Sequence, residues 1–190
     1  MGQLKAIEKL KTPVTLKSLI DDLESLGVKK GMNLIVHSSL SSLGWVCGGA
    51  VSLISALVEA VTSEGTLIMP AHSSGLTEPR YWSNPPVPES WWNTIRETMP
   101  AFNTQLTPTE HIGIVPEVFR SYPDCNRSNH PSNSFSAWGK HSEKVLSTQK
   151  LEYSMSDSSP LGELYNLDGY VLLLGCGYDS NTALHLAETR

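Results

Sequence analysis

The spacing of apolar residues along the chain predicts alternating helices and strands. Residues 15–27, TLKSLIDDLESLG, place leucine and isoleucine three and four positions apart, which is typical of one face of a helix. Thr15 suits the N-cap of this helix, and Gly27 suits the position just after its end. The apolar runs NLIVHS (33–38) and GTLIMP (65–70) predict two short buried strands.

A second helix is expected between these two strands. The segment AVSLISALVEAVT carries Val51, Ile54, Val58 and Val61 at helical spacing. A strand, a helix and a second strand in this order form a βαβ unit, in which the two strands lie parallel in one sheet. The pattern therefore predicts an α/β fold with a mostly parallel central sheet and flanking helices.

The middle of the chain has a weaker pattern. Residues 71–108 are rich in proline and tryptophan and are predicted to form a long loop, of the kind used as a lid or a binding wall. A helix is expected over 109–121, with Pro116 marking either a kink or its true first turn. Residues 128–148 are predicted to be rich in turns and to contain one short helix.

The last part of the chain returns to a clear pattern. SSPLGELYNL predicts a helix with Ser159 as N-cap and Pro160 in the first helical position. DGYVLLLGCG (168–177) predicts a third buried strand, and a further helix is expected to begin near Thr182. The whole chain, residues 1–190, is interpreted as one α/β domain that is incomplete at its C-terminus.

Polar residues follow each of the three predicted strands. In an open α/β sheet, ligands bind beyond the carboxyl ends of the strands. We therefore expect these residues to approach one cleft: Ser38, Ser39, His72, Ser73, Ser74, Cys176 and Asp179.

Two features within this predicted cleft leave alternatives open. The loop SSLGWVCGGA leads from a strand into a helix, so it either receives an anionic ligand at the helix N-terminus or is a βα turn without a ligand. His185 and Glu188 lie three apart on one helical face. They form either a general base with an orienting carboxylate or an incidental surface pair.

Other candidate residues favour structural roles. His37 is interpreted as a hydrogen-bonded histidine of the core, and His111 as a lid residue or one without a role. Cys47 and Cys176 are interpreted as buried thiols rather than nucleophiles, because no base lies near either in the sequence.

Composition narrows the possible functions. With 39% hydrophobic and 17% charged residues, the chain has enough apolar material for a packed core. Its formal net charge of −5 and the absence of a Lys/Arg cluster argue against nucleic-acid binding. The apolar runs are too short to span a membrane, and the N-terminus lacks the features of a signal peptide or a myristoylation site. Three widely spaced cysteines, without a CxxC metal site, predict a cytoplasmic protein.

Several long motifs, in order, resemble one family. VHSSLSSLGWVCGGAVSLISALVEAVTSEGTLIMPAHSS, TPTEHIGIVPEVFRSYPDCNRSNHPSNSFSAWGK and SSPLGELYNLDGYVLLLGCGYDSNTALHLAE are similar to the aminoglycoside 3-N-acetyltransferases. The resemblance covers the chain from about residue 15. It implies an antibiotic N-acetyltransferase fold, distinct from the GNAT fold of the commoner acetyltransferases. It also implies transfer of acetyl from acetyl-CoA to the 3-amino group of a 2-deoxystreptamine aminoglycoside, without a metal.

The resemblance also implies roles for particular residues. The family motif DxNTxxHxxE corresponds to Asp179, Asn181, Thr182, His185 and Glu188. His185 is the implied general base, with Glu188 orienting it, and we expect Thr182 to stabilise the oxyanion and Asp179 to bind a substrate ammonium. The implied CoA-binding residues are Ser38, Ser39, Leu43, Gly44, Trp45, Val46, Cys47, Gly48, Ser73 and Ser74.

Three alternatives stay open beside this interpretation. The chain could bind CoA without catalysis, or acetylate an amine that is not an aminoglycoside. It could also be a hydrolase with Cys176 or Ser38 as nucleophile, although no base pairs with either residue in the sequence.

Overall fold

The computed structural model describes residues 7–8 and 10–190 of the chain. The segment on which the absence of a signal peptide was predicted falls largely outside these residues. Among the described residues, no helix is both long enough and apolar enough to cross a bilayer. The cytoplasmic location stays a prediction.

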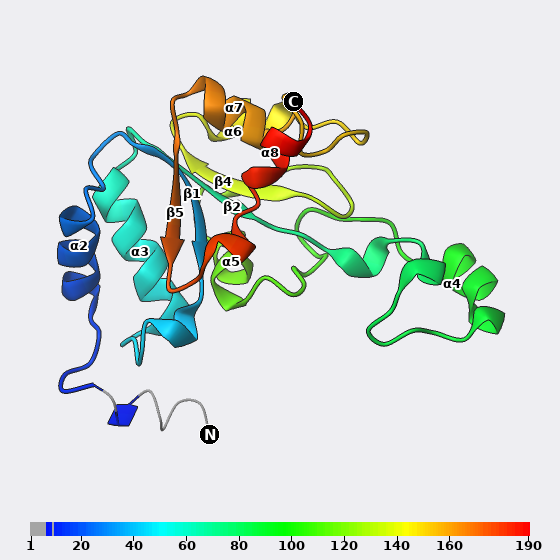
Figure 1. Ribbon diagram of the computed structural model, residues 1–190, viewed down its shortest axis with the longest axis horizontal. Coiled ribbons are helices and arrows are strands. Elements are labelled where there is room, and N and C mark those ends of the chain that lie inside the picture. Colours follow the sequence, from blue (N-terminus) through cyan, green and yellow to red (C-terminus); the bar gives the residue numbers. More distant parts are fainter. Residues whose placement is uncertain (1–6, 9) are drawn as a thin grey trace.

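A sheet of five strands in the order β3-β4-β2-β1-β5 forms the centre of the structure (Figure 1). The strands are β1 (Asn33–Ser38), β2 (Thr66–Pro70), β3 (Asn126–Arg127), β4 (Phe135–Gly139) and β5 (Tyr170–Leu174). β1 pairs in parallel with both β2 and β5, whereas β4 pairs antiparallel with β2 and β3. The predicted α/β fold with parallel central strands is therefore confirmed.

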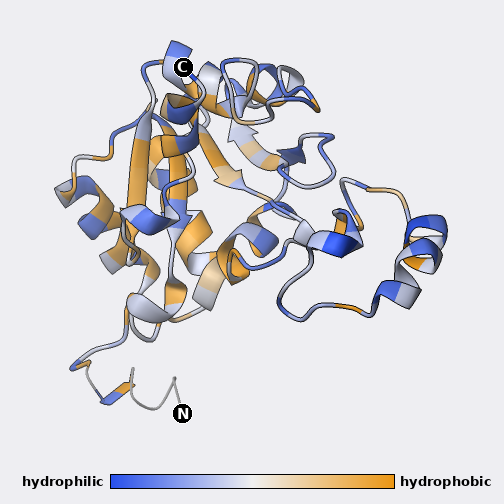
Figure 2. Cartoon of the chain, turned by 45° about the vertical axis from the view of Figure 1, so that its right-hand side comes forward, coloured by the Kyte–Doolittle hydropathy of each residue, from blue (hydrophilic) through white to orange (hydrophobic). Residues whose placement is uncertain are grey.

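Helices cover both faces of this sheet. They are α2 (Leu16–Ser25), α3 (Gly49–Val61), α5 (Ile114–Phe119), α6 (Ser142–Ser147), α7 (Pro160–Asn166) and α8 (Leu184–Glu188), whereas α4 (Trp92–Thr98) lies apart from the sheet. The helices α2, α3 and α5 pack on one face, in a first core cluster that includes Leu53, Leu67 and Phe119. The helices α6, α7 and α8 lie over the other face, where Ile35 and Phe135 belong to a second cluster. Figure 2 shows the apolar residues concentrated along the sheet and the inner sides of these helices.

The predicted ends of two helices are confirmed in atomic detail. The amide of Ser18 donates to the Thr15 hydroxyl at 3.2 Å, and the Thr15 amide donates to the Ser18 hydroxyl at 2.9 Å. This reciprocal pair starts α2, and Gly27, with φ +93°, follows its end. Ser159 caps α7 by accepting a hydrogen bond from the amide of Leu161 at 3.2 Å.

The predicted buried face of α3 needs a correction. Ile54 and Val61 are fully buried as expected, but Val51 is 56% exposed. Leu53 and Leu57 point into the core instead. The helix is apolar on most of its sides, so the spacing of its apolar residues did not determine which side faces the sheet.

Two predictions about strands are also wrong. Residues 135–139, expected to lie in a segment of turns, form β4, in which Ala137 pairs with Ile68 of β2. β5, expected to be buried, is an edge strand of the described sheet, and Tyr170 is 56% exposed. Among the described residues, β5 pairs only with β1 and therefore lies at the edge of the sheet. Its apolar sequence alone did not distinguish an edge strand from a central one.

The predicted loop at 71–108 contains local structure of its own. Short 3₁₀ turns at Ser74–Leu76, Pro79–Tyr81 and Glu89–Trp91 precede α4, and the segment extends away from the body of the molecule (Figure 1). We call residues 72–113 the arm, and none of them belongs to either core cluster. The helix expected over 109–121 is shorter, and Pro116 lies in its first turn, one of the two alternatives.

Candidate active site

A cleft of about 840 Å³ opens at the carboxyl edge of the sheet. Its lining comes from the ends of β1 and β2, the loop from β1 to α3, the first turn of α5 and the loop that follows β5. The lining residues are Val36, His37, Ser38, Ser39, Leu40, Ser41, Gly44, Trp45, Val46, Gly49, Pro70, His111, Ile112, Gly113, Ile114, Val115, Pro116, Cys176, Asp179, Ser180 and Thr182.

The loop between β1 and α3 forms one wall of this cleft. Its path is fixed by backbone bonds, since Ser39 donates its amide to the Leu174 carbonyl at 2.9 Å and Cys47 donates to Val14 at 2.8 Å. Gly49 opens α3 with φ +58°, and no atom lies within 4 Å of the position that a Cβ would take there. The loop therefore leaves open space at the N-terminus of a thirteen-residue helix, where the positive end of the helix dipole favours an anion.

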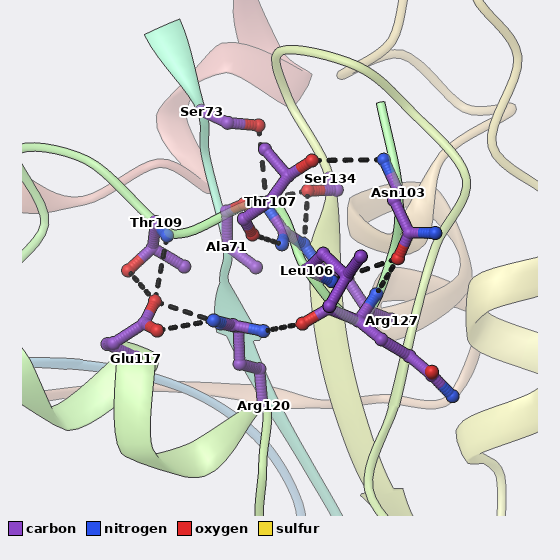
Figure 3. A network of polar contacts seen from close by, with 11 residues as sticks. Ala71, Ser73, Asn103, Leu106, Thr107, Thr109, Glu117, Arg120, Arg127 and Ser134 are labelled. Atoms are coloured by element: carbon purple, nitrogen blue, oxygen red, sulfur yellow. Dashed lines mark hydrogen bonds and ion pairs between the residues drawn. The ribbon is translucent and has the colours of Figure 1, made fainter. Parts of the chain in front are cut away.

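The opposite wall is the segment from His111 to Pro116, which leaves the arm and enters α5. A network of polar contacts holds the chain just before this wall (Figure 3). The Glu117 carboxylate accepts hydrogen bonds from the amide and the hydroxyl of Thr109 at 2.7 and 2.8 Å. Arg120 donates to the same carboxylate at 2.9 and 2.5 Å. Arg120 therefore holds the pKa of Glu117 well below its usual range, at about 2.

Arg127 extends this network to the sheet (Figure 3). Its guanidinium donates to the Ala71 carbonyl at 2.5 Å, to the Ser134 hydroxyl at 2.9 Å and to the carbonyl of Thr107. Burial lowers the pKa of Arg127 to about 10, with a smaller effect from Arg120. The return of the arm is thus fastened to the end of β2 and to β4.

The histidine and glutamate near the end of the chain form a pair. His185 Nδ1 lies 2.6 Å from Glu188 Oε2, and both side chains are more than half exposed. Because a carboxylate can only accept, Nδ1 carries the proton and Nε2 is left free. The pair follows the loop whose Asp179 and Thr182 line the cleft. The backbone amide of His185 donates to the backbone carbonyl of Thr182 at 3.1 Å.

The chain has clear similarity to known proteins. The model of the aminoglycoside 3-N-acetyltransferase family matches residues 35–190. The chain belongs to this family. The family consists of acyltransferase enzymes, and the family membership expected from the motifs is confirmed.

Three relatives show how far the similarity to the family extends. The SPbeta prophage-derived aminoglycoside N(3′)-acetyltransferase-like protein YokD of Bacillus subtilis (strain 168) is 54% identical over 98% of this chain and 69% of its own length. The crystal structure of YokD superposes with a TM-score of 0.95, over 97% of this chain and 69% of that chain. The aminoglycoside N(3)-acetyltransferase VIII of Streptomyces fradiae is 35% identical over 100% of this chain and 66% of its own length.

The third relative has a structure in complex with a ligand. The structure of AAC-IIIb in binary complex with CoASH has a TM-score of 0.82 and 32% identity, over 93% of this chain and 65% of that chain. The chain thus spans about two thirds of the length of the family members that it matches.

In the present chain, the site residues predicted from the sequence fall into two groups, those that line the cleft and those that do not. The structure brings seven of them to the cleft: Ser38, Ser39, Gly44, Trp45, Val46, Asp179 and Thr182. Among the others, Leu43 packs against the first core cluster, Cys47 is exposed and Gly48 caps α3 in a left-handed conformation.

His72, Ser73 and Ser74, all expected at the cleft, do not belong to its lining. The Ser73 hydroxyl is buried and donates to the carbonyl of Pro131 at 2.8 Å. The Ser74 hydroxyl donates to the Glu110 carboxylate at 2.8 Å. Both hydroxyls therefore hold the arm near its start.

Sequence reasoning missed part of the cleft. The wall from His111 to Pro116 was assigned to a helix, and only Gly113, with φ +83°, signals that the chain turns there. His37 is buried as expected, but its Nε2 has no hydrogen-bond partner among the described residues, and it lines the cleft. Cys176, interpreted as a buried thiol, is half-buried and lines the cleft as well.

Proposed function

We propose that this chain carries the cofactor cleft and the general base of an acetyl-CoA-dependent aminoglycoside N-acetyltransferase. The acceptor is the 3-amino group of a 2-deoxystreptamine ring. The observation that carries this proposal is the hydrogen-bonded His185–Glu188 pair, joined by a short loop to residues that line a large cleft. Family membership and the CoASH complex of a relative support it.

The cleft suits a CoA molecule. Its volume of about 840 Å³ lies within the range of ligand sites in proteins. Ser38 and Trp45 offer a hydroxyl and an aromatic surface along one wall, where α3 begins at Gly49 with the positive end of its dipole. Acetyl-CoA supplies an activated acyl group as a thioester when it binds.

His185 removes a proton from the acceptor. An aminoglycoside amine is mostly protonated near neutral pH, and it is nucleophilic only after it loses a proton. His185 accepts that proton at Nε2, directly or through a water molecule, while Glu188 holds the ring and stabilises the imidazolium. The amine then forms the amide bond, and the thiolate of CoA leaves.

Two residues of the loop after β5 complete the proposed site. Thr182 lines the cleft beside His185 and is proposed to donate to the developing oxyanion. Asp179 is exposed at the cleft and is proposed to bind a second ammonium of the acceptor.

The test is release of CoA thiol from acetyl-CoA in the presence of a 2-deoxystreptamine aminoglycoside. His185→Ala is expected to lower kcat by roughly 10²–10⁴-fold, whereas CoA binding by calorimetry stays unchanged. His141→Ala, at the start of α6, is the matched control and is expected to retain full turnover. Equal turnover in wild type and His185→Ala would disprove the base assignment.

A second candidate function is a CoA-binding protein without catalysis. The exposure of both His185 and Glu188 favours it, because a general base works best in a site closed to water. Calorimetric CoA binding together with no thiol release from any amine would establish this alternative.

A hydrolase has less support from the structure. The Ser38 hydroxyl has no hydrogen-bond partner among the described residues, so no base activates it. Covalent labelling of Ser38 or Cys176 by an electrophilic ester analogue would support this alternative function.

A further inference from the structure

The buried histidines of the described chain differ in how their ring nitrogens are bonded. His130 is only 5% exposed and fully bonded. Its Nδ1 accepts the amides of Ser132 and Asn133 at 3.2 and 2.9 Å, and its Nε2 lies 3.3 Å from the carbonyl of Leu151. His130 therefore holds a turn together and has a structural role.

His37 and His72 are different. The Nε2 atoms of both rings are buried and have no hydrogen-bond partner among the described residues. A buried polar atom without a partner costs about 1–3 kcal/mol, and such atoms are rare in native structures. A bound molecule that supplies the missing partner would explain both.

The two rings lie on the sheet face that α8 covers. Side chains alternate along a strand, so His37 shares a face with Ile35 of the second core cluster. The ring of His72 meets Phe135, another member of that cluster, edge-on at 5.5 Å. Leu186 of α8 belongs to the same cluster, next to His185 in sequence.

Burial keeps both rings neutral, and neighbouring titratable groups add to this effect at His72. Burial lowers the pKa of His37 to about 4. Burial also lowers the pKa of His72 to about 4, with further lowering by the nearby His37, His185, His130 and Arg127. Near neutral pH both rings are therefore uncharged.

The backbone of His72 is held in place on both sides. Arg127 donates to the Ala71 carbonyl at 2.5 Å and to the Ser73 hydroxyl at 3.3 Å, and Glu110 donates its amide to the His72 carbonyl at 2.9 Å. Figure 3 shows Ala71 and Ser73 near this guanidinium. His72 is thus positioned in advance rather than free to find a partner within the protein.

We propose that His37 and His72 are acceptor-contacting residues, whose unpaired Nε2 atoms hydrogen-bond the amine substrate beside His185. This inference rests on the proposed acetyltransferase function. A neutral imidazole can accept from an ammonium or donate to a hydroxyl, and an aminoglycoside carries both groups. The pair orients the acceptor without repelling its positive charge.

This assignment predicts opposite effects on stability and on acceptor binding. Replacing His72 by Leu removes a buried unpaired nitrogen, so we expect an unchanged or higher Tm. The same change removes a bond to the acceptor, so we expect acceptor KM to rise about tenfold while the Kd for CoA stays constant. His37→Leu is expected to raise acceptor KM and to leave Tm unchanged or higher, but His37 also lines the cleft proposed for CoA, so the constant Kd for CoA is expected of His72→Leu alone. His72→Gln, which keeps a polar group, is expected to recover part of the acceptor affinity.

Two variants serve as controls. Ser136 also has a buried, unpaired hydroxyl, but it alternates with Phe135 and Ala137 and thus lies on the opposite face of the sheet. Ser136→Ala is expected to retain or raise Tm with no change in acceptor KM. His130→Leu breaks bonds that the protein itself makes, so its Tm is expected to fall.

The measurements are thermal unfolding, steady-state kinetics and calorimetric titration of a 2-deoxystreptamine aminoglycoside in the presence of CoA. A fall in Tm of His72→Leu as large as that of His130→Leu, or unchanged acceptor affinity in both His72→Leu and His37→Leu, would overturn the inference. Absence of acetyl transfer by the wild type would count against the proposed function alone, because unfolding and amine titration do not require turnover.

Discussion

The Glu117 carboxylate accepts two hydrogen bonds from Thr109, one from its amide and one from its hydroxyl. This contact joins the last part of the arm to the helix that forms one wall of the cleft. It depends on a charged carboxylate, whose pKa is held at about 2 by Arg120 and then by these two bonds.

The first prediction concerns acid stability. The folded pKa of Glu117 lies below its unfolded value of about 4.5, so its contribution is complete above that pH and is lost as the pH falls toward 2. Glu117→Gln should therefore be less stable than wild type at pH 7, and the difference should shrink by pH 3. Urea unfolding at both pH values measures this, with Glu64→Gln, an exposed partner of Lys140, as control. The same difference at both pH values would contradict the prediction.

A second prediction concerns two glycines with similar backbone angles. Gly139 has φ +98°, and a Cβ there would lie 2.2 Å from the carbonyl oxygen of Gly65, just before the neighbouring strand β2. Gly27 has φ +93°, but nothing lies within 4 Å of its Cβ position. Gly27→Ala should cost about 1–2 kcal/mol of backbone strain, and Gly139→Ala about 3 kcal/mol or more. Equal losses of free energy of unfolding in the two variants, measured by denaturant unfolding, would show that the backbone at the end of β4 shifts to accommodate a Cβ.

Thiol labelling gives a third prediction, which needs no turnover. Cys47 is exposed outside the cleft, Cys176 is half-buried within it, and burial raises the pKa of Cys125 to about 12. Iodoacetamide at pH 8 should label Cys47 rapidly, Cys176 more slowly and Cys125 hardly at all. Added CoA should protect Cys176 but not Cys47, as followed by mass spectrometry. Protection of Cys47 alone would instead favour the CoA contacts implied by the family resemblance.

The fourth prediction concerns the fastening of the arm. Arg127→Met leaves the acceptors at Ala71, Thr107 and Ser134 without their donor, so we expect a loss of about 2–4 kcal/mol. Cleavage within the arm by a protease should become faster. Arg96→Met is the matched control, because Arg96 pairs with Glu78 inside the arm and both side chains are partly exposed. Equal protease sensitivity in the two variants would show that Arg127 does not hold the arm.

The sequence was sufficient to predict those parts of the fold that depend on interactions between residues a few positions apart. Thr15 and Ser159 cap helices through bonds to residues two or three positions away, and the apolar runs of β1 and β2 are short and continuous. These interactions are encoded within a few residues, so their pattern predicted them. The same applies to the His185–Glu188 pair, whose partners are three residues apart.

Parts of the fold that depend on distant residues could not be predicted in this way. β4 is only five residues long and includes Ser136, and its pairing with β2 joins segments more than sixty positions apart. The wall at 111–116 takes its place because Arg127 bonds to Thr107 and Ala71, which are 20 and 56 positions away. The unpaired Nε2 of His37 is likewise a property of its surroundings rather than of the strand that carries it.

The way the arm is attached has a consequence for its tolerance of substitution. It contributes no residue to either core cluster, and Arg127 and Glu117 fasten its return to the rest of the molecule. Most substitutions between these fastenings therefore leave the free energy of unfolding nearly unchanged. The last residues of the arm, His111, Ile112 and Gly113, line the cleft, whereas the rest of the arm can change in length and chemistry at little cost to the stability of the fold.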